Sequence, residues 1–332
     1  MKKSVLALFM ISMLIFTACG SVADASEKVG ATVFKLSFNQ TIENPQARTM
    51  LILSDKLYDA TNGRYSIEVF PNEELGPQRE SLELVQVGVI EMALIANSLV
   101  ENVIPDFAII GTPYIYDSID HQKRLFQSGA LDELFRSAER AGFSVLSAYS
   151  LGPRNVYTRG GPVTKPEELE GLKIRVMQSD TMVQMLNYMG GVGTPMGQGD
   201  VYSAIQAGVL DGAENNIITY VDLVQYEVAP FYSETNHLMI PDLLIIHNNV
   251  LQGMSEEDRR TLRQLANESI GIFYDMAAEL RETYRARAVE FGVTFTTVDI
   301  APFQARMAPF IDEISNRTEM TRSVAAKIKE MR

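Results

Sequence analysis

Arg175 is the residue whose place in the sequence most clearly requires a chemical partner. It lies within Leu172–Val176, a segment that predicts a buried strand, just after Gly171 ends a short helix. A cation inside such a strand is tolerated only when an anion satisfies it. Because a planar guanidinium holds a carboxylate through two parallel hydrogen bonds, we expect an anion here, either a bound ligand or a carboxylate of the protein itself.

Asn215 lies at the end of a second predicted strand, downstream of Arg175. The segment Asp200–Gly208 has the spacing of apolar residues that is typical of a helix, and Val209–Ala213 follows it as a short strand. The Asn215 side chain can donate and accept hydrogen bonds, although asparagine is also common in turns that follow strands. We expect these strand ends and the start of the helix to converge.

The chain from Ala31 onward resembles the solute-binding proteins of tripartite ATP-independent periplasmic (TRAP) transporters, of the dicarboxylate-binding-protein type. The motifs that carry the resemblance are GLKIRV at Gly171–Val176, TPM at Thr194–Met196, VYSAIQAGVLDG at Val201–Gly212, AEN at Ala213–Asn215, PYIYDS at Pro113–Ser118, LGPRNVYT at Leu151–Thr158 and ELGPQRE at Glu74–Glu80. The resemblance implies an α/β, two-lobed periplasmic-binding-protein-like fold, with a ligand cleft between the lobes and a long helix spanning both.

The same resemblance assigns expected roles to residues of the cleft. It implies that Arg175 forms a bidentate salt bridge with a ligand carboxylate, that Arg154 is a second arginine facing the cleft, and that Asn215 supports the same carboxylate. It also places six loop residues around the rest of the ligand: Asn39, Gln78, Glu80, Asn97, Gln178 and Gln198. Taken singly, each of these six is more typical of a solvent-facing position. Together, amides and one carboxylate suit hydroxyl groups better than an apolar tail.

The N-terminal elements predict how these loops are positioned. Strands are expected at Val33–Phe38, Tyr65–Phe70 and Ile90–Ala96, with helices after Asn44 and at Gln78–Val87 between them. This β-α-β-α-β series predicts a largely parallel sheet. Ligands on such sheets bind beyond the carboxyl ends of the strands, which here are followed by Asn39, the loop Pro71–Glu80 and Asn97.

The pattern restarts at Leu151 and predicts a second α/β domain. We expect residues 31–150 and 240–280 to form lobe I, and residues 151–239 and 281–332 to form lobe II. A helix from Glu256 to about Phe291 would extend ~50 Å, which is longer than one small domain needs. The resemblance implies that it spans both lobes. A dimerising coiled coil is the alternative, but its apolar residues keep no strict heptad.

The N-terminus has the pattern of a secretory signal. Lys2 and Lys3 precede the uncharged run Val5–Thr17, and small residues surround Cys19, the only cysteine of the chain. We expect residues 1–18 to be a cleaved signal peptide, Cys19 to be lipidated, and residues 19–30 to form a tether to the membrane surface. An ordinary cleaved signal with an incidental cysteine is the alternative.

Charge and motifs argue against several other classes of protein. Loss of Lys2 and Lys3 would change the formal net charge from −13 to −15, which disfavours nucleic-acid binding. His121, His237 and His247 show no metal-ligand spacing, so we expect no metal site and no cofactor. Within the sequence we find no GxSxG nucleophile motif and no GxGxxG phosphate loop, and we predict that the protein is not an enzyme.

The resemblance therefore predicts a binding protein that delivers a carboxylated small molecule to the membrane subunits of a TRAP permease. The segments RVMQS, VYSAIQAG and DGAENN are most similar to the uronate-binding branch, which favours D-glucuronate or D-galacturonate as the ligand. C4-dicarboxylates and sialic acid are the alternatives within the family. A ligand-sensing receptor subunit and a secreted hydrolase are the alternatives outside it.

Overall fold

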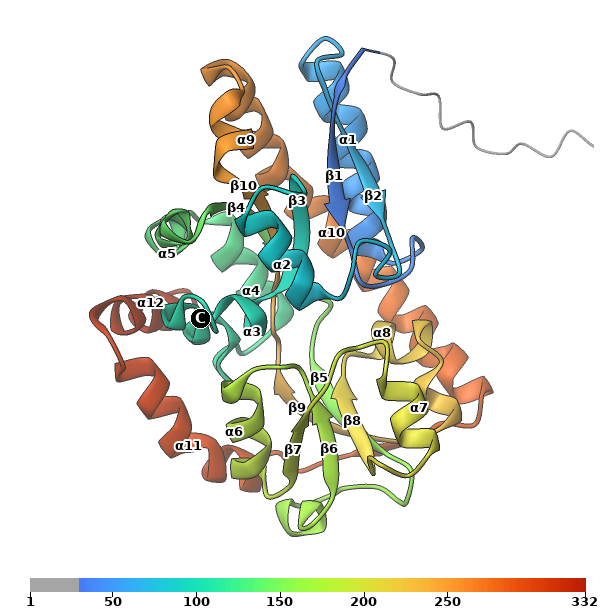
Figure 1. Ribbon diagram of the computed structural model, residues 1–332. Coiled ribbons are helices and arrows are strands. Elements are labelled where there is room, and N and C mark those ends of the chain that lie inside the picture. The colour runs from blue at the N-terminus through green and yellow to red at the C-terminus, as the bar shows by residue number, and fades with distance from the viewer. Residues whose placement is uncertain (1–29) are drawn as a thin grey trace, which may run out of the picture.

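The protein consists of two β-sheets flanked by helices, one sheet in each of two lobes, which Figure 1 shows one above the other. The computed structural model describes residues 30–332. The predicted signal peptide and Cys19, with the tether up to residue 29, lie outside the described residues. Among the described residues, no helix is long and apolar enough to cross a membrane. The predicted two-lobed α/β fold is confirmed.

The first sheet has five strands in the order β2-β1-β3-β10-β4. These strands are β1 (Thr32–Ser37), β2 (Tyr65–Phe70), β3 (Met92–Ala96), β4 (Phe143–Tyr149) and β10 (Asp242–His247). β1 pairs in parallel with β2 and β3, as predicted for the N-terminal series, and β10 is antiparallel to both β3 and β4. The reason is that the chain enters β10 from the second lobe, at the edge where β3 and β4 end.

The second sheet has six strands in the order β11-β9-β5-β8-β6-β7. These strands are β5 (Arg154–Thr158), β6 (Lys173–Val176), β7 (Val192–Pro195), β8 (Gly212–Asn215), β9 (Phe231–Leu238) and β11 (Thr294–Thr297). β6 pairs in parallel with β7 and β8, and β5 is antiparallel to β8 and β9. The strand predicted to carry Arg175 is β6, and the one predicted to end near Asn215 is β8.

Helices cover both sheets. Those between residues 45 and 253 are α1 (Pro45–Ala60), α2 (Gln78–Gln86), α3 (Asn97–Val100), η1 (Pro105–Gly111), α4 (Ile119–Gln127), α5 (Asp132–Arg136), η2 (Ser137–Ala141), η3 (Pro166–Leu169), α6 (Asp180–Met189), α7 (Val201–Gln206), α8 (Ile217–Asp222), η4 (Gln225–Glu227) and α9 (Asn248–Gly253). Those that follow are α10 (Glu256–Glu290), α11 (Ala301–Asn316) and α12 (Glu319–Glu330). η and α denote 3₁₀ and α-helices.

Local sequence signals explain where the helices that shape the cleft begin. The Asn44 side chain accepts a hydrogen bond from the backbone N–H of Gln46 and Pro45 occupies the first turn, so α1 starts immediately after the loop that carries Asn39. Ser179 caps α6 in the same way through the N–H of Met182. Both caps fix the point at which the chain leaves a cleft loop and enters a rigid helix.

α10 connects the two lobes physically. Its 35 residues extend about 52 Å, and it packs against α1 and β4 of the first lobe and against α8 of the second. The prediction of a long helix spanning both lobes is confirmed. α12, which falls in the range predicted for lobe II, packs instead against η1 of the first lobe. There His121 Nε2 lies 2.8 Å from the carbonyl oxygen of Ile328.

Candidate functional site

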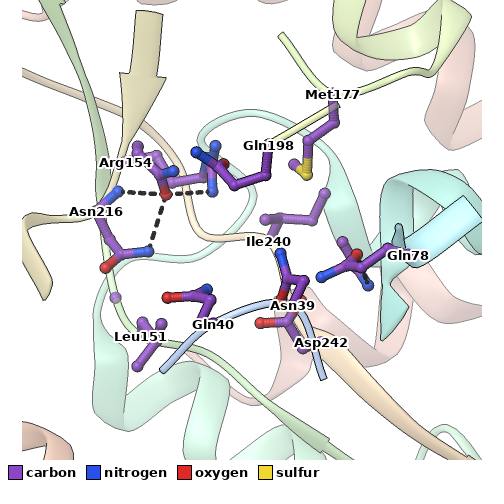
Figure 2. A pocket seen from close by; sticks show the side chains of 13 residues that line it. Asn39, Gln40, Gln78, Leu151, Arg154, Met177, Gln198, Asn216, Ile240 and Asp242 are labelled. Atoms are coloured by element: carbon purple, nitrogen blue, oxygen red, sulfur yellow. Dashed lines mark hydrogen bonds between the residues drawn. The ribbon is translucent and has the colours of Figure 1, made fainter. Parts of the chain in front are cut away.

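Two adjoining pockets lie where the lobes face each other. The first, of about 420 Å³, is lined by residues of both lobes, including Gln40, Arg154, Asn215, Asn216 and Asp242 (Figure 2). The second, of about 360 Å³, is lined by Arg175, Gln178 and Glu73 among others. The two pockets share a set of lining residues: Asn39, Gln78, Met177 and Gln198. The two pockets therefore form one continuous polar site between the lobes.

Arg175 is a buried cation that no carboxylate of the described residues pairs with. Its side chain projects from β6 and the residue is 3% exposed. Nε and Nη2 donate to the carbonyl oxygen of Met196 at 2.9 and 2.7 Å, and Nη1 donates to Gln198 Oε1 at 3.2 Å. Burial lowers the pKa of Arg175 to about 10, although Glu214 attracts the charge from a distance. The sequence predicted either a bound ligand or a carboxylate of the protein as the partner of Arg175. The described residues provide no such carboxylate, so a ligand anion is the partner that is left.

Arg154, by contrast, already has an anion. It is 6% exposed on β5, and its Nε and Nη2 donate to the two carboxylate oxygens of Glu214 at 2.6 and 2.7 Å. His237 Nε2 lies 3.4 Å from the same carboxylate. Burial acts to raise the pKa of Glu214, but Arg154 and His237 outweigh it and hold that pKa at about 2. The charge of Arg154 is thus compensated within the protein, although the residue lines the first pocket.

Asn215 joins the Arg154 pair to the pocket wall. Its Oδ1 accepts hydrogen bonds from Arg154 Nη1 at 2.8 Å, from the backbone N–H of Asn216 at 3.0 Å and from Asn216 Nδ2 at 3.1 Å, the dashed lines in Figure 2. Since its oxygen is fully used, Nδ2 is the atom through which Asn215 can serve a ligand. It can therefore donate to a ligand oxygen but has no free acceptor.

Two side chains shared by both pockets carry buried polar atoms without a partner. Asn39 Oδ1 and Gln198 Nε2 are both shielded from solvent and make no hydrogen bond within residues 30–332. Gln78, the third amide shared by the pockets, uses its Oε1 to accept from the backbone N–H of Ala96 at 3.0 Å. Buried polar atoms are normally satisfied. The acceptor Asn39 Oδ1 and the donor Gln198 Nε2 are both without a partner in this site, which indicates that a polar ligand forms hydrogen bonds with them.

The structure brings seven of the nine predicted ligand-site residues to the pockets and leaves two outside. Glu80 is exposed on α2 and does not line either pocket. Asn97 is fully buried beneath the site, where its Nδ2 donates to the carbonyl oxygen of Phe107 at 2.8 Å. The expected carboxylate of this loop is supplied by Glu73, whose burial raises its pKa while Arg175 lowers it.

Asp242 is a second carboxylate of the pocket that the sequence analysis missed. It is the first residue of β10, where it is paired with Ala96 of β3 and with Tyr149 of β4. Gln46 Nε2 donates to its Oδ2 at 2.6 Å, and burial raises the pKa of Asp242 to about 6. The sequence signal for it is Pro241-Asp242, which stands directly before the apolar run Leu243–Ile246. To place Asp242 in the pocket from this signal, one must also know that the strand is antiparallel to β3 and β4, because this direction brings its first residue to the cleft.

Side chains of the two lobes also meet directly beside the pockets. Thr219 Oγ1 of the second lobe donates to Gln40 Oε1 of the first at 3.1 Å. On the other side, Ser179 Oγ donates to the buried carboxylate of Glu101, and burial raises the pKa of that carboxyl to about 7. The lobes are thus closed on the site, and a ligand would be enclosed by both.

The histidines and methionines have structural positions. Among residues 30–332, no group of three or more histidine, cysteine, aspartate or glutamate side chains could hold a metal ion. His121 lies in α4, where its ring contacts the carbonyl oxygen of Ile328 in α12. Met182, Met185 and Met189 are buried on one face of α6.

The arrangement defines a class of protein: a two-lobed solute-binding protein that encloses a small anionic or polar molecule. More specifically, the chain belongs to the bacterial extracellular solute-binding protein family 7, whose family model matches residues 36–318. This is a family of extracytoplasmic transport proteins rather than of enzymes. The resemblance to TRAP solute-binding proteins is confirmed.

Known relatives extend along almost the whole chain. A solute-binding protein of Chromohalobacter salexigens is 30% identical over 332 residues, covering 99% of this chain and 97% of its own. The sialic acid-binding periplasmic protein SiaP of Vibrio cholerae is 26% identical, covering 92% of this chain and 94% of its own. The matches therefore include both lobes.

Solved structures agree with the fold. A TRAP periplasmic solute-binding protein of Anaerococcus prevotii with bound α/β-D-glucuronate has a TM-score of 0.87 at 31% identity, covering 90% of this chain and 98% of its own. One of Xanthobacter autotrophicus with bound β-D-galacturonate has a TM-score of 0.86 at 30% identity, covering 90% and 99%. Both neighbours hold a sugar acid.

Proposed function

We propose that this protein binds a hexuronate, D-glucuronate or D-galacturonate, and delivers it to the membrane subunits of a TRAP permease. The observation that carries the proposal is Arg175, a buried guanidinium inside the pocket without a carboxylate partner among the described residues. A ligand carboxylate is the partner of matching charge and geometry. The sugar acids bound by the two structural neighbours support the choice of ligand class.

The balance of charge in the site supports one carboxylate rather than two. Arg154 is paired with Glu214, and Arg79, which also lines the second pocket, is exposed and lies 3.6 Å from Glu83, so Arg175 is the buried cation left for a ligand within the described part of the site. A C4-dicarboxylate would bring a second negative charge toward Glu73 or Asp242. Repulsion between this second carboxylate and a carboxylate of the pocket would cost more free energy than hydrogen bonds from the amides of the pocket would contribute. The hydroxyl groups of a sugar instead satisfy unused amide atoms such as Asn39 Oδ1.

Each lining residue then has a distinct task. Arg175 binds the carboxylate, the Nδ2 group of Asn215 donates to an adjacent oxygen, and Gln198 donates through its unused Nε2. Asn39 and Gln78, which touch both pockets, contact the ring hydroxyls. Because the two lobes supply different members of this set, the ligand favours the closed form, and the closed form is the one that a permease recognises.

The N-terminal segment supports the cellular setting of the proposal. The basic, apolar and small-residue pattern before Cys19 is typical of a lipoprotein signal. We assign Cys19 as the lipidated residue and residues 19–30 as the tether that keeps the protein at the outer surface of the membrane. Mass spectrometry of the membrane-bound protein tests this, since an unmodified Cys19 or a cleavage site elsewhere would contradict it.

Isothermal titration of the protein that begins at residue 31 tests the ligand. D-glucuronate and D-galacturonate are titrated beside succinate, L-malate and D-glucose, with Arg175→Met as the matched control. The proposal requires heat of binding for at least one uronate in the wild type and none in the variant. Binding of succinate without either uronate would contradict the ligand class, and uronate binding that survives in the variant would contradict the role of Arg175.

A further inference from the structure

Asp242 occupies a position from which it can act on the ligand. It starts β10, and because β10 is antiparallel to β3 and β4, its first residue lies at the edge where those strands end, beside the cleft. Figure 2 shows its carboxylate among the side chains around the first pocket. Arg175 lines the second pocket and not the first. The cation and this carboxylate therefore belong to opposite parts of one continuous site.

One oxygen of Asp242 is held and the other is free. Oδ2 accepts from Gln46 Nε2 at 2.6 Å, and Gln46 is fully buried in α1. Oδ1 receives no hydrogen bond from any residue between 30 and 332. A carboxylate that is fixed through one oxygen and presents the other to a pocket is an oriented acceptor, which suits a hydroxyl donor.

No cation of the described site neutralises Asp242 fully. Arg154 attracts it, but both oxygens of Glu214 already hold that guanidinium. Glu214 and Asp242 thus share one arginine, and this part of the site carries an excess of negative charge. The site is polarised, with a free cation in the second pocket and a free carboxylate oxygen in the first.

From this arrangement we propose that Asp242 determines ligand specificity, by accepting a hydrogen bond from a hydroxyl group remote from the ligand's carboxylate and by excluding a second carboxylate from that end. The inference rests on the proposed binding of a uronate at Arg175. It assigns the orientation of the ligand, with the carboxylate in the second pocket and the polyhydroxyl end in the first. It also predicts that dicarboxylated sugars are rejected.

The test compares D-glucuronate with D-glucarate, the related dicarboxylate that carries a second carboxylate at C1. In the wild type, glucarate binds at least about 100-fold more weakly than glucuronate, because it brings two like charges together. In Asp242→Asn the charge is removed at nearly constant volume, and the new amide can still bond Gln46. We expect weaker glucuronate binding and a glucarate-to-glucuronate Kd ratio at least about tenfold smaller than in the wild type.

Glu73→Gln is the matched control, because it removes one negative charge from the Arg175 end of the site. It should change the affinities for both ligands by a similar factor and leave their ratio unchanged. A ratio that is equal in wild type and Asp242→Asn, with the variant folded by circular dichroism, overturns the role of Asp242 alone. A wild type that binds neither uronate overturns the proposed function and this inference together.

Discussion

Replacing each of the two buried arginines by methionine separates a binding residue from a structural one. Arg175→Met removes a charge whose pKa burial lowers to about 10, well below the usual range for arginine. Since a pKa unit corresponds to about 1.4 kcal/mol, holding this charge costs the folded state on the order of 3 kcal/mol. The variant also loses the three hydrogen bonds that Arg175 donates, two to Met196 and one to Gln198, and each contributes about 1 kcal/mol to stability. The two effects nearly cancel, so we expect the free energy of unfolding of the ligand-free variant to lie within about 1 kcal/mol of the wild type.

Arg154→Met should have the opposite effect on stability. It leaves the fully buried Glu214 carboxylate without its bidentate partner. Breaking a buried ion pair from one side costs roughly 3–5 kcal/mol. The two substitutions, identical in chemistry, are thus expected to differ by several kcal/mol in the free energy of unfolding.

Urea unfolding without ligand and calorimetric titration with D-glucuronate measure the two effects. Arg175→Met should abolish detectable binding, and Arg175→Lys, which keeps the charge but not the planar fork, should lose ~2–5 kcal/mol, roughly thirty-fold or more in affinity. If Arg175→Met unfolds as easily as Arg154→Met, or if Arg175→Lys binds with wild-type affinity, Arg175 is a structural residue and the site has been assigned wrongly.

Three further outcomes follow from single contacts. Burial raises the pKa of Glu101 to about 7 in the folded state, so the folded protein binds more protons than the unfolded chain between about pH 4.5 and 7, and the free energy of unfolding should rise by up to about 3 kcal/mol as pH falls through this window. Glu101→Gln, which can still accept a hydrogen bond from Ser179, should reduce the dependence of melting temperature on pH. An unchanged pH dependence would contradict this. Gly212→Ala would place a Cβ 2.1 Å from the carbonyl oxygen of Tyr157, so we expect β5 and β8 to separate, with a loss of more than about 3 kcal/mol in urea unfolding; a loss below 1 kcal/mol would show that the strands adjust. Asn215→Asp keeps the acceptor oxygen but replaces the Nδ2 donor by a negative charge in the first pocket, so melting temperature should change little while uronate affinity falls at least about tenfold in calorimetry; wild-type affinity would show that Asn215 does not contact the ligand.

Elements set by local signals were predictable from the sequence. The strand expected at Tyr65–Phe70 has these bounds in the structure, and the long helix begins at Glu256 as expected, after the Ser255 cap. Capping residues and apolar periodicity act within one or two turns, so the sequence alone specifies them.

Side-chain directions around the site were harder to predict. Gln78 and Glu80 lie two positions apart in α2, and this corresponds to about 200° around a helix, so only one of them can face the pocket. Gln78 does, and Glu80 points to solvent. Glu73 takes the place in the pocket that was predicted for Glu80. Asn72 and Glu73 adopt left-handed backbone conformations, with φ of 53° and 60°, that turn the loop. Such conformations are uncommon for residues other than glycine, and the sequence does not indicate them.

The pairing of Arg154 changes the argument about the ligand. Counted along the sequence, two cleft arginines are available, and a dicarboxylate could use both. In the structure, β5 and β8 are antiparallel neighbours with Val156 opposite Glu214, and this register brings the Glu214 carboxylate onto Arg154. Only the register reveals the pair, since the two residues are sixty positions apart. With Arg154 compensated by Glu214 and the exposed Arg79 beside Glu83, Arg175 is the buried cation of the described site that has no carboxylate partner, and the case for a ligand with a single carboxylate becomes stronger than residue counting allowed.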